Sequence, residues 1–301
     1  MRNIAVLTEK LAKPFLKWAG GKGQLLTEIG RRLPNGLETG EIDTYVEPFV
    51  GGGAVFFHIA QRYEGIKRFY LFDINNDLVN CYNAIKNNVE SLIGELEKLE
   101  NGFLPLAKSA RKEFYYQIRK EFNSDRSPAK LIFLNKNCYN GLYRVNRKDE
   151  FNVPFGDYKN PKICDAENLK SVSKVLQKAE IICADFEKSD KYINDKTFVY
   201  FDPPYRPLSP TASFTSYSKD DFNEDEQIRL ARFCRQIHRK GAKFLLSNSD
   251  PKNEDPKDGF FEENYEKFRF DIDRVKATRA INCKGAGRGQ INELIITNYV
   301  R

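Results

Sequence analysis

Short apolar runs alternate along this chain with longer segments in which apolar residues recur every three or four positions. The short runs are typical of buried strands, and the longer repeat is typical of amphipathic helices. Several runs are apolar almost throughout, as expected of a parallel sheet covered on both faces. This alternation predicts an open α/β sheet. The expected strands are residues 43–50, 68–74, 180–186, 197–204, 242–249 and 292–299.

The clearest helix is predicted over residues 224–241, EDEQIRLARFCRQIHRKG. Asn223 is a suitable N-cap with Glu226 three residues later, and Gly241 is suited to ending the helix. The apolar positions on its expected buried face are Leu230, Phe233, Cys234 and Ile237.

Residues 87–164 break this alternation. Helices are predicted within 87–135, where SLIGELEKLE and ARKEFYYQIRKEF show helical spacing. The following NCYNGLYRVNRKDEFNVPFGDY alternates around a polar turn at residues 146–150, which predicts a β-hairpin. The sequence therefore predicts a discontinuous α/β domain, residues 1–86 and 165–301, interrupted by an insertion at 87–164.

The distribution of charge adds to this picture, because the basic excess is confined to the insertion. The 301 residues include 49 Lys and Arg and 42 Asp and Glu, a net charge of +7. Residues 108–162 hold thirteen of the basic and six of the acidic residues, so the rest of the chain balances. A second stretch, 274–292, has five basic residues and no acidic one. Charge alone leaves open a solvated face and a polyanionic partner.

The remaining composition predicts a folded cytoplasmic protein. No apolar run approaches the roughly 20 residues that span a bilayer, and MRNIAVLTEKLAK lacks a signal-peptide core. No membrane contact is expected. The six cysteines include no CxxC pair and the two histidines are isolated, so no metal site is predicted and reduced, buried thiols are expected.

A nucleoside pocket is indicated by DTYVEPFVGGGAVFFHIA, in which a strand meets three glycines and a helix. Glycines let a ligand approach the backbone, and a helix N-terminus favours electronegative groups. The next strand ends at Asp73, 22 residues after Gly51, where an acid can accept hydrogen bonds from ribose hydroxyls. Phe56 stands where a dinucleotide site requires a small residue, and KWAGGKGQL lacks the spacing of a P-loop. An adenosine cofactor is predicted, and its identity stays open.

The strand at 197–204 runs into Asp-Pro-Pro-Tyr at residues 202–205. Proline has no N–H, so the turn presents the Asp202 carboxylate and the Pro203 carbonyl without competing donors. Two acceptors on a stiff backbone suit an amino group with two N–H donors, and Tyr205 offers a ring on which a base can stack. The turn could be a simple chain reversal, but this chemistry favours the exocyclic amino group of a base.

Taken together, these motifs resemble those of the DNA adenine-N6 methyltransferases, and specifically the GATC-methylating, Dam-like group. The resemblance covers nearly the whole chain, and it implies a Rossmann-like S-adenosylmethionine-dependent methyltransferase sheet with a helical and β-hairpin target-recognition insertion. Double-stranded DNA is the implied partner, S-adenosylmethionine the implied methyl donor, and no metal is implied. The motifs are KWAGGK, YVEPFVGGG, LFDIN, NCYNGLYRVN, EFNVPFG, FVYFDPPYRPLSPTASFTSY and RGQINELIITNY.

The resemblance also implies roles for individual residues, with Lys17 expected at the first guanine. The residues implied in cofactor binding are Trp18, Lys22, Phe49, Gly51, Asp73, Asp185, Phe186 and Asp202. Those implied in binding and activating the target adenine are Asp202, Pro203, Pro204 and Tyr205. Those implied in DNA binding are Lys17, Tyr139, Asn140, Leu142, Arg144, Pro154 and Tyr158.

The mechanism expected of such a site is direct methyl transfer. Acceptors at Asp202 and Pro203 would draw the N–H bonds of adenine N6 and stabilise the positive charge that develops there. The adenine must first leave the duplex, at a cost of a few kcal/mol. The alternatives are an amino methyltransferase acting on RNA or a protein glutamine, and a DNA-binding relative without activity. The sequence is compatible with an orphan methylase and with one that has a cognate restriction endonuclease.

Overall fold

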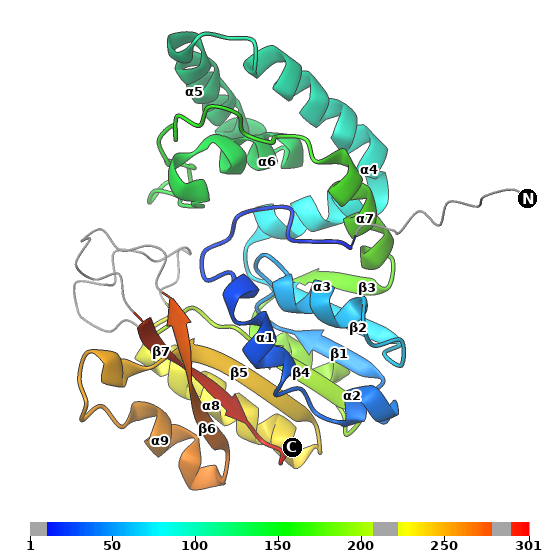
Figure 1. Ribbon diagram of the computed structural model, residues 1–301, viewed down its shortest axis with the longest axis vertical. Coiled ribbons are helices and arrows are strands. Elements are labelled where there is room, and N and C mark those ends of the chain that lie inside the picture. Colours follow the sequence, from blue (N-terminus) through cyan, green and yellow to red (C-terminus); the bar gives the residue numbers. More distant parts are fainter. Residues whose placement is uncertain (1–10, 207–221, 279–289, 301) are drawn as a thin grey trace, which may run out of the picture.

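The computed structural model describes residues 11–206, 222–278 and 290–300, which form a seven-stranded sheet with helices packed around it (Figure 1). The strand order is β3-β2-β1-β4-β5-β7-β6. All strand pairs are parallel except those of β7, which is antiparallel to β5 and to β6. The predicted α/β sheet is confirmed. The strands are β1 Thr44–Glu47, β2 Arg68–Asp73, β3 Ala179–Cys183, β4 Thr197–Phe201, β5 Lys243–Ser249, β6 Asp271–Thr278 and β7 Gln290–Thr297.

The order in which strands are added to the sheet changes sides at β1: β2 and β3 lie on one side of it, and β4 and β5 on the other. Val46 of β1 is in register with Tyr70 of β2 on one side and with Val199 of β4 on the other. The carboxyl ends of the three strands therefore share one edge, and the loops that follow them are neighbours. In open α/β sheets this reversal point is where ligands bind. The topology thus brings together the glycine loop (residues 51–53), Asp73 and the Asp-Pro-Pro-Tyr turn.

Two buried apolar clusters cover the two faces of the sheet, which accounts for strands that are apolar at almost every position. Successive residues of a strand point to opposite faces. Tyr45 and Tyr200 accordingly belong to one cluster, and Val46 and Phe201 to the other. The helices are α1 Leu26–Gly30, α2 Gly36–Thr39, α3 Ala54–Ala60, α4 Asn76–Phe103, α5 Lys108–Asp125, α6 Pro128–Asn137, α7 Ala166–Leu176, α8 Glu224–Arg239 and α9 Phe260–Asn264.

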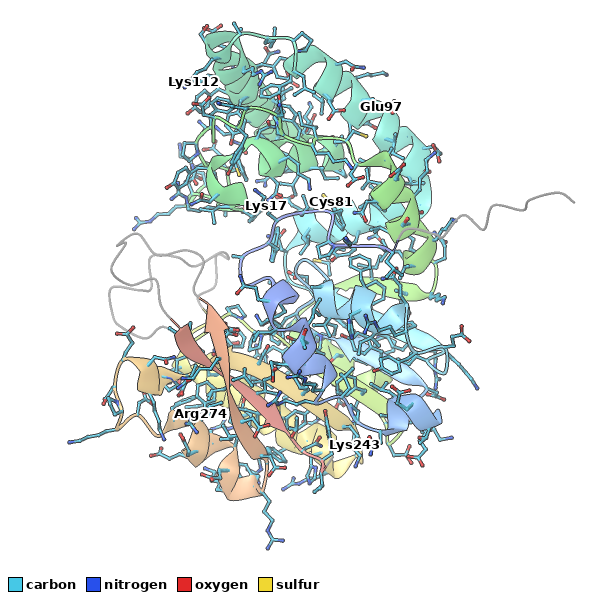
Figure 2. All side chains as sticks on the ribbon, in the orientation of Figure 1. Lys17, Cys81, Glu97, Lys112, Lys243 and Arg274 are labelled. Atoms are coloured by element: carbon cyan, nitrogen blue, oxygen red, sulfur yellow. The ribbon has the colours of Figure 1, made fainter. Side chains whose placement is uncertain are left out.

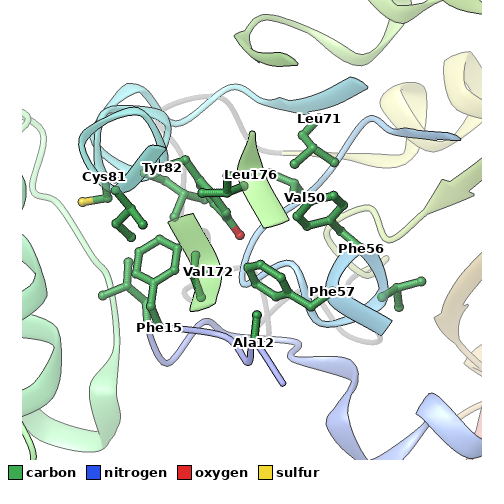
Figure 3. Close-up of a cluster of buried hydrophobic side chains, with 14 of the residues drawn as sticks. Ala12, Phe15, Val50, Phe56, Phe57, Leu71, Cys81, Tyr82, Val172 and Leu176 are labelled. Atoms are coloured by element: carbon green, nitrogen blue, oxygen red, sulfur yellow. The ribbon is translucent and has the colours of Figure 1, made fainter. Parts of the chain in front are cut away.

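The first cluster joins segments that are far apart in sequence. Figure 3 shows Phe15, Phe57 and Tyr82 packed with Val172 and Leu176 of α7. The rings of Phe15 and Tyr82 meet edge to face, with centroids 4.9 Å apart. The N-terminal segment is therefore fixed against α3, α4 and α7, which places the residues that follow it at the carboxyl edge of the sheet.

Helix α8 confirms the prediction from its sequence. The Asn223 side chain accepts a hydrogen bond from the backbone N–H of Glu226 at 3.1 Å. Gly241 follows the helix with a φ of +85°, a conformation that glycine adopts readily. The four apolar residues expected on its inner face are all buried: Leu230, Phe233, Cys234 and Ile237.

Helices α4, α5 and α6 stand together beyond the β3 end of the sheet (Figure 1). The expectation of helices within 87–135 is confirmed, although α4 already begins at Asn76. A kink interrupts α4 at Asn88, where φ is −143° and ψ is 46°. Helix α4 packs against both α6 and α7, so one long helix connects the sheet to the helices beyond it.

The β-hairpin expected at residues 137–158 is wrong in detail. This described segment contains two isolated antiparallel bridges, Cys138 with Phe155 and Val145 with Phe151, and no regular strand. Asn140 has a φ of +56°, and Pro154 has no N–H to donate, so a continuous ladder cannot form. The chain reverses as expected, but its backbone is irregular.

Other sequence expectations are also corrected. Strand β3 ends at Cys183, so Asp185 and Phe186 lie beyond it. Helix α7 and strand β6 were not anticipated. Cys81, Cys138 and Cys234 are buried as expected, whereas Cys183 is exposed, and Cys283 lies outside the described residues. No helix in the described part of the chain has the length and apolar character needed to cross a membrane.

Candidate active site and nucleic-acid interface

Asp202 begins the turn that follows β4, and a lysine from the N-terminal segment meets it. Lys22 Nζ lies 2.6 Å from Asp202 Oδ1, and their side chains are 4% and 19% exposed. Ser247 Oγ on β5 donates to the same oxygen at 3.3 Å. Burial raises the pKa of Asp202, and the Lys22 ammonium opposes that rise. Asp202 is therefore a largely buried acceptor, in surroundings where electrostatic interactions are strong.

Tyr205 is held at the end of the same turn. Its hydroxyl donates to Glu293 Oε2 of β7 at 2.6 Å, and Lys22 Nζ lies 4.7 Å from its ring centroid. The Pro204 carbonyl accepts a hydrogen bond from Gln227 Nε2 at 2.8 Å. Burial, together with the charges of Asp202 and Glu293, raises the pKa of Tyr205 well above its ordinary value. The phenol is therefore neutral at neutral pH.

Asp73 and the glycine loop meet at the carboxyl ends of β1 and β2. The backbone N–H groups of Gly51 and Asn75 donate to the Asp73 carboxylate at 3.0 and 2.9 Å. Burial raises the pKa of Asp73 to about 6, even though these two bonds lower it. Gly51 has a φ of +47°, and a Cβ there would lie 2.9 Å from Trp18 Cδ1. Trp18 thus covers a loop position that only glycine fits.

Aromatic rings line the sheet edge beside this loop. Phe49 lies 5.4 Å from Phe186 and 5.6 Å from Phe222, measured between ring centroids. The carboxylate of Asp185 is held by Arg229, whose Nη1 and Nη2 donate to its two oxygens at 2.9 and 2.7 Å. Burial would raise the pKa of Asp185, but these bonds lower it below its ordinary value. Asp185 is therefore ionised.

Asn135 of α6 fixes the segment that bears the predicted DNA contacts. Its Oδ1 accepts from the Lys17 N–H at 2.9 Å, and its Nδ2 donates to the carbonyls of Lys17 and Gly141, each at 2.9 Å. Figure 2 shows Lys17 where the N-terminal segment passes α6. Lys17 Nζ lies 5.0 Å from the centroid of the Tyr158 ring. A side chain at Gly141, which has a φ of +65°, would collide with Lys17.

The side chains in this segment are turned outward. Tyr139 is 55% exposed, and its N–H donates to the Pro154 carbonyl at 2.9 Å. Arg144 is exposed, and its Nε donates to Asn152 Oδ1 at 2.7 Å. The structure thus places six of the predicted DNA-contacting residues within residues 137–158, and Asn135 links Lys17 to that segment. Asn140 and Pro154 are also exposed, and Leu142 and Tyr158 are half-buried.

Trp18 connects this segment to the glycine loop. Its ring stacks on Tyr143 with a centroid distance of 5.3 Å and an interplanar angle of 30°. The Tyr143 hydroxyl donates to Asp77 Oδ2 at 2.8 Å, and Arg126 Nη1 lies 2.7 Å from the same oxygen. The glycine loop and residues 137–158 are therefore connected through the rings of Trp18 and Tyr143.

Comparison with known families decides the class of enzyme. The family model described as D12 class N6 adenine-specific DNA methyltransferase matches residues 18–281, a span that contains Trp18, the glycine loop and the Asp-Pro-Pro-Tyr turn. The chain belongs to this family. As a D12-class methyltransferase it acts on DNA adenine, and this activity implies S-adenosylmethionine as the methyl donor. Its mixed seven-stranded sheet is consistent with a Rossmann-like methyltransferase fold.

Individual relatives of this D12-class methyltransferase match over nearly their full length. The type II methyltransferase M.MjaIII of Methanocaldococcus jannaschii is 55% identical over 295 residues, covering 95% of this chain and 99% of that protein. The type II methyltransferase M1.LlaDCHI of Lactococcus lactis subsp. cremoris is 40% identical over 297 residues, or 95% of each chain. The DNA adenine methylase of Escherichia coli strain K12 is 37% identical over 290 residues, again 95% of each.

Several residues around the turn could not be assigned from the sequence. The sequence signal for Glu293 is that it is the single charged residue of NELIITNY, a strand within one of the family motifs. Ser247, Gln227 and Asn135 carried no comparable signal, because polar residues in apolar surroundings are common. Across the described residues, no cluster of His, Cys, Asp and Glu could hold a metal ion.

Proposed function

We propose that this methyltransferase methylates adenine N6 within GATC in duplex DNA, as an orphan methylase or as part of a restriction-modification system. Two of its relatives are named type II methyltransferases, which supports a cognate endonuclease, and others are named DNA adenine methylase. The GATC assignment rests on NCYNGLYRVN and EFNVPFG, and Gly141 of the first motif lies against Lys17 in the fold.

The contact between Lys22 and Asp202 is the observation that carries the assignment of the catalytic turn. An ammonium nitrogen lies 2.6 Å from Asp202 Oδ1 and both side chains are largely buried, so this carboxylate accepts from an N–H donor there. In the proposed reaction the target amino group takes that position, and Lys22 moves aside. Asp202 and the Pro203 carbonyl then accept from N6 and stabilise its developing positive charge. Tyr205 stacks on the flipped base, and Pro203 and Pro204 keep the turn rigid.

The residues at the sheet edge fit S-adenosylmethionine, which supplies an electrophilic methyl group when bound. Glycine at position 51 lets the Trp18 ring close over the loop, and Asp73 has a carboxylate at the end of the neighbouring strand, where a ribose could bind. Asp185 keeps lone pairs beyond those used by Arg229, because a carboxylate has about four acceptor sites. The proposed cofactor residues are Trp18, Lys22, Phe49, Gly51, Asp73, Asp185, Phe186 and Asp202.

Residues 87–164 are proposed to be the target-recognition insertion, and residues 1–86 and 165–301 the catalytic domain. Support comes from the kink at Asn88 and from the basic excess within the insertion. Basic side chains on one surface suit a phosphate backbone, and exposed polar side chains on a fixed backbone suit base edges. The proposed DNA contacts are Lys17, Tyr139, Asn140, Leu142, Arg144, Pro154 and Tyr158.

Protection of plasmid DNA from cleavage tests this proposal. Plasmid is incubated with the enzyme and S-adenosylmethionine, then digested with two GATC-cutting nucleases, one blocked by N6-methyladenine and one indifferent to it. We expect resistance to the first nuclease and complete cutting by the second. Mapping of N6-methyladenine to another sequence would overturn the GATC assignment. Methylation of RNA or protein in preference to DNA would overturn the proposed substrate.

A further inference from the structure

Glu293 on β7 reaches the catalytic turn from the opposite side to Lys22. Its Oε2 accepts the Tyr205 hydroxyl at 2.6 Å, so Tyr205 contacts a carboxylate at its phenol end while Lys22 lies 4.7 Å from its ring centroid. Hydrogen bonds to an ionised acceptor are shorter and about twice as strong as neutral ones. The 2.6 Å distance is in that range. The bond therefore restrains the direction in which the Tyr205 ring points.

The strand that bears Glu293 is rigid, because it is paired on both sides. Glu293 is in register with Ser249 of β5 and with Val275 of β6. It shares a face with Ile295, two residues along, which is fully buried. Since β7 is hydrogen-bonded to both neighbours, the Glu293 Cα cannot shift without disturbing two ladders. The carboxylate is thus a fixed anchor for Tyr205.

The rest of the turn is anchored independently of Glu293. The Pro204 carbonyl is bound by Gln227, the Arg206 N–H donates to Asn248 Oδ1 at 3.3 Å, and Asp202 is bound by Lys22 and Ser247. These bonds fix the backbone and the carboxylate. Lys22 also lies over the face of the Tyr205 ring, but the bond that holds the ring by its hydroxyl is the one to Glu293. A tyrosine side chain can rotate about two bonds, so a fixed Cα alone does not define where its ring lies.

We propose that Glu293 is a positioning residue for base capture: it holds the Tyr205 ring in the plane on which the flipped adenine stacks. This inference rests on the proposed function of the turn. Glu293 does not contact the base in this scheme, and it acts through the Tyr205 hydroxyl. Removing the bond leaves DNA affinity and cofactor affinity unchanged, but it lowers the fraction of complexes in which the base is stacked in the pocket.

Two substitutions break the same bond from opposite ends. Glu293→Leu removes the acceptor, and Tyr205→Phe removes the donor while keeping the stacking ring. Each variant is assayed for single-turnover methyl transfer on a duplex that the wild-type enzyme methylates. Base flipping is read from the fluorescence of 2-aminopurine at the target position. We expect each variant to lose about tenfold in transfer rate and to give a smaller fluorescence rise. The double variant should be no worse than either single one.

The conservative variant Glu293→Gln separates positioning from charge. Its amide oxygen still accepts from Tyr205, so it should stay within about threefold of wild type. Glu262→Leu is the matched control, because this α9 carboxylate bonds Lys252 and Arg274 and not Tyr205. It should change thermal stability without changing the fluorescence rise. If Glu293→Leu does not fold, Tyr205→Phe carries the test.

Three outcomes would overturn the role of Glu293. The first is wild-type base flipping in Tyr205→Phe, the second is full additivity in the double variant, and the third is a loss in Glu293→Gln as large as in Glu293→Leu. A wild-type enzyme that transfers methyl groups without any 2-aminopurine signal would instead overturn the proposed base-flipping function of the turn. The two failures are therefore distinguishable.

Discussion

The proposed catalytic turn, residues 202–205, and the proposed recognition segment, residues 137–158, hold their functional side chains in opposite ways. In the turn, Asp202 and Tyr205 are bound by other side chains, which come from the N-terminal segment and from the central strands. In the recognition segment, Asn135 holds the backbone, while side chains such as Tyr139 and Arg144 point into solvent.

The two tasks require this difference. Stabilising charge that develops on a reacting nitrogen needs dipoles that are already oriented in a dry site, so that none must reorganise during the reaction. Reading base edges needs side chains that project into a hydrated groove from a backbone of defined shape. The turn is therefore built from buried partners, and the recognition segment is fixed beneath its exposed side chains. Substitutions of single side chains in these regions and in the cofactor site should therefore have different effects.

Loss of Asp202 should give the largest effect. Asp202→Ala removes the side-chain acceptor for N6, so methyl transfer should fall by at least about a hundredfold. Transfer of a tritiated methyl group to duplex DNA measures it. Asp43→Ala is the matched control, since this ion-paired aspartate precedes β1 at the opposite edge of the sheet. Near-normal turnover in Asp202→Ala would show that the turn is not the catalytic centre.

Loss of Asp73 should affect the cofactor and spare the DNA. Asp73→Ala removes a carboxylate at the end of β2, and the loss of a charged hydrogen bond costs about 1.5–3 kcal/mol. S-adenosylmethionine affinity should therefore fall by about tenfold to a hundredfold. Calorimetry for the cofactor and an equilibrium DNA-binding assay measure the two affinities separately. An equal loss in both would mean that the substitution has damaged the fold and not the ribose site.

The sequence predicted the features of the molecule that depend on local chemistry. The cap at Asn223, the strands that are apolar on both faces, and the acceptors of the Asp-Pro-Pro-Tyr turn can all be read from a few neighbouring residues. The missed strand β6 is the edge strand beside β7, and four of its residues are charged: Asp271, Asp273, Arg274 and Lys276. These charges interrupt the apolar pattern from which a strand is predicted.

Contacts between distant residues could not be predicted in the same way. The pairing of Lys22 with Asp202, and of Glu293 with Tyr205, depends on which strands the fold places side by side. The hairpin prediction is confirmed for the chain reversal and wrong for its regular strands. Alternation indicated strands, but the left-handed backbone at Asn140 and the missing donor at Pro154 prevented a ladder.

Arg144 and Arg147 should separate reading from positioning within the recognition segment. Both are exposed, but the Arg144 Nε is fixed by Asn152, which leaves its two terminal nitrogens oriented as a pair. A bidentate contact to guanine O6 and N7 gives about 1–3 kcal/mol of discrimination. Arg144→Ala should therefore lose preference at one guanine position and keep it elsewhere.

Arg147→Ala serves as the control for that experiment. It should weaken binding to all sites alike and reduce the salt dependence of binding, as expected of a phosphate contact. A panel of duplexes that each differ from GATC by one base pair measures both variants. Uniform loss across the panel for Arg144→Ala would show that this arginine positions the DNA and does not read it.

The pH dependence of cofactor binding should follow Asp73. Its pKa is raised from near 3.8 to about 6, so its neutral form favours the folded apoprotein at low pH, and that contribution is lost as pH rises through about 6. Ribose hydroxyls need the ionised acceptor, so cofactor affinity should fall by about tenfold per unit below pH 6. Calorimetry between pH 5 and 7.5 measures this, and Asp73→Asn should flatten the profile. A wild-type profile that is already flat would contradict the assignment.

The smallest effect should come from Asn146, which shapes the recognition segment without touching DNA. Its Oδ1 accepts from the N–H groups of Lys148 and Glu150 at 2.9 and 3.0 Å, and its Nδ2 donates to Glu150 Oε2 at 2.8 Å. Side-chain bonds of this kind stabilise a turn by about 1 kcal/mol. Asn146→Ala should therefore weaken DNA binding a few-fold, because the turn must be ordered on binding. Sequence preference should stay unchanged, since Arg144 keeps its bond to Asn152. Loss of preference at a guanine position in Asn146→Ala would show that this turn also orients Arg144. The recognition segment would then depend on bonds between its side chains as strongly as the catalytic turn does.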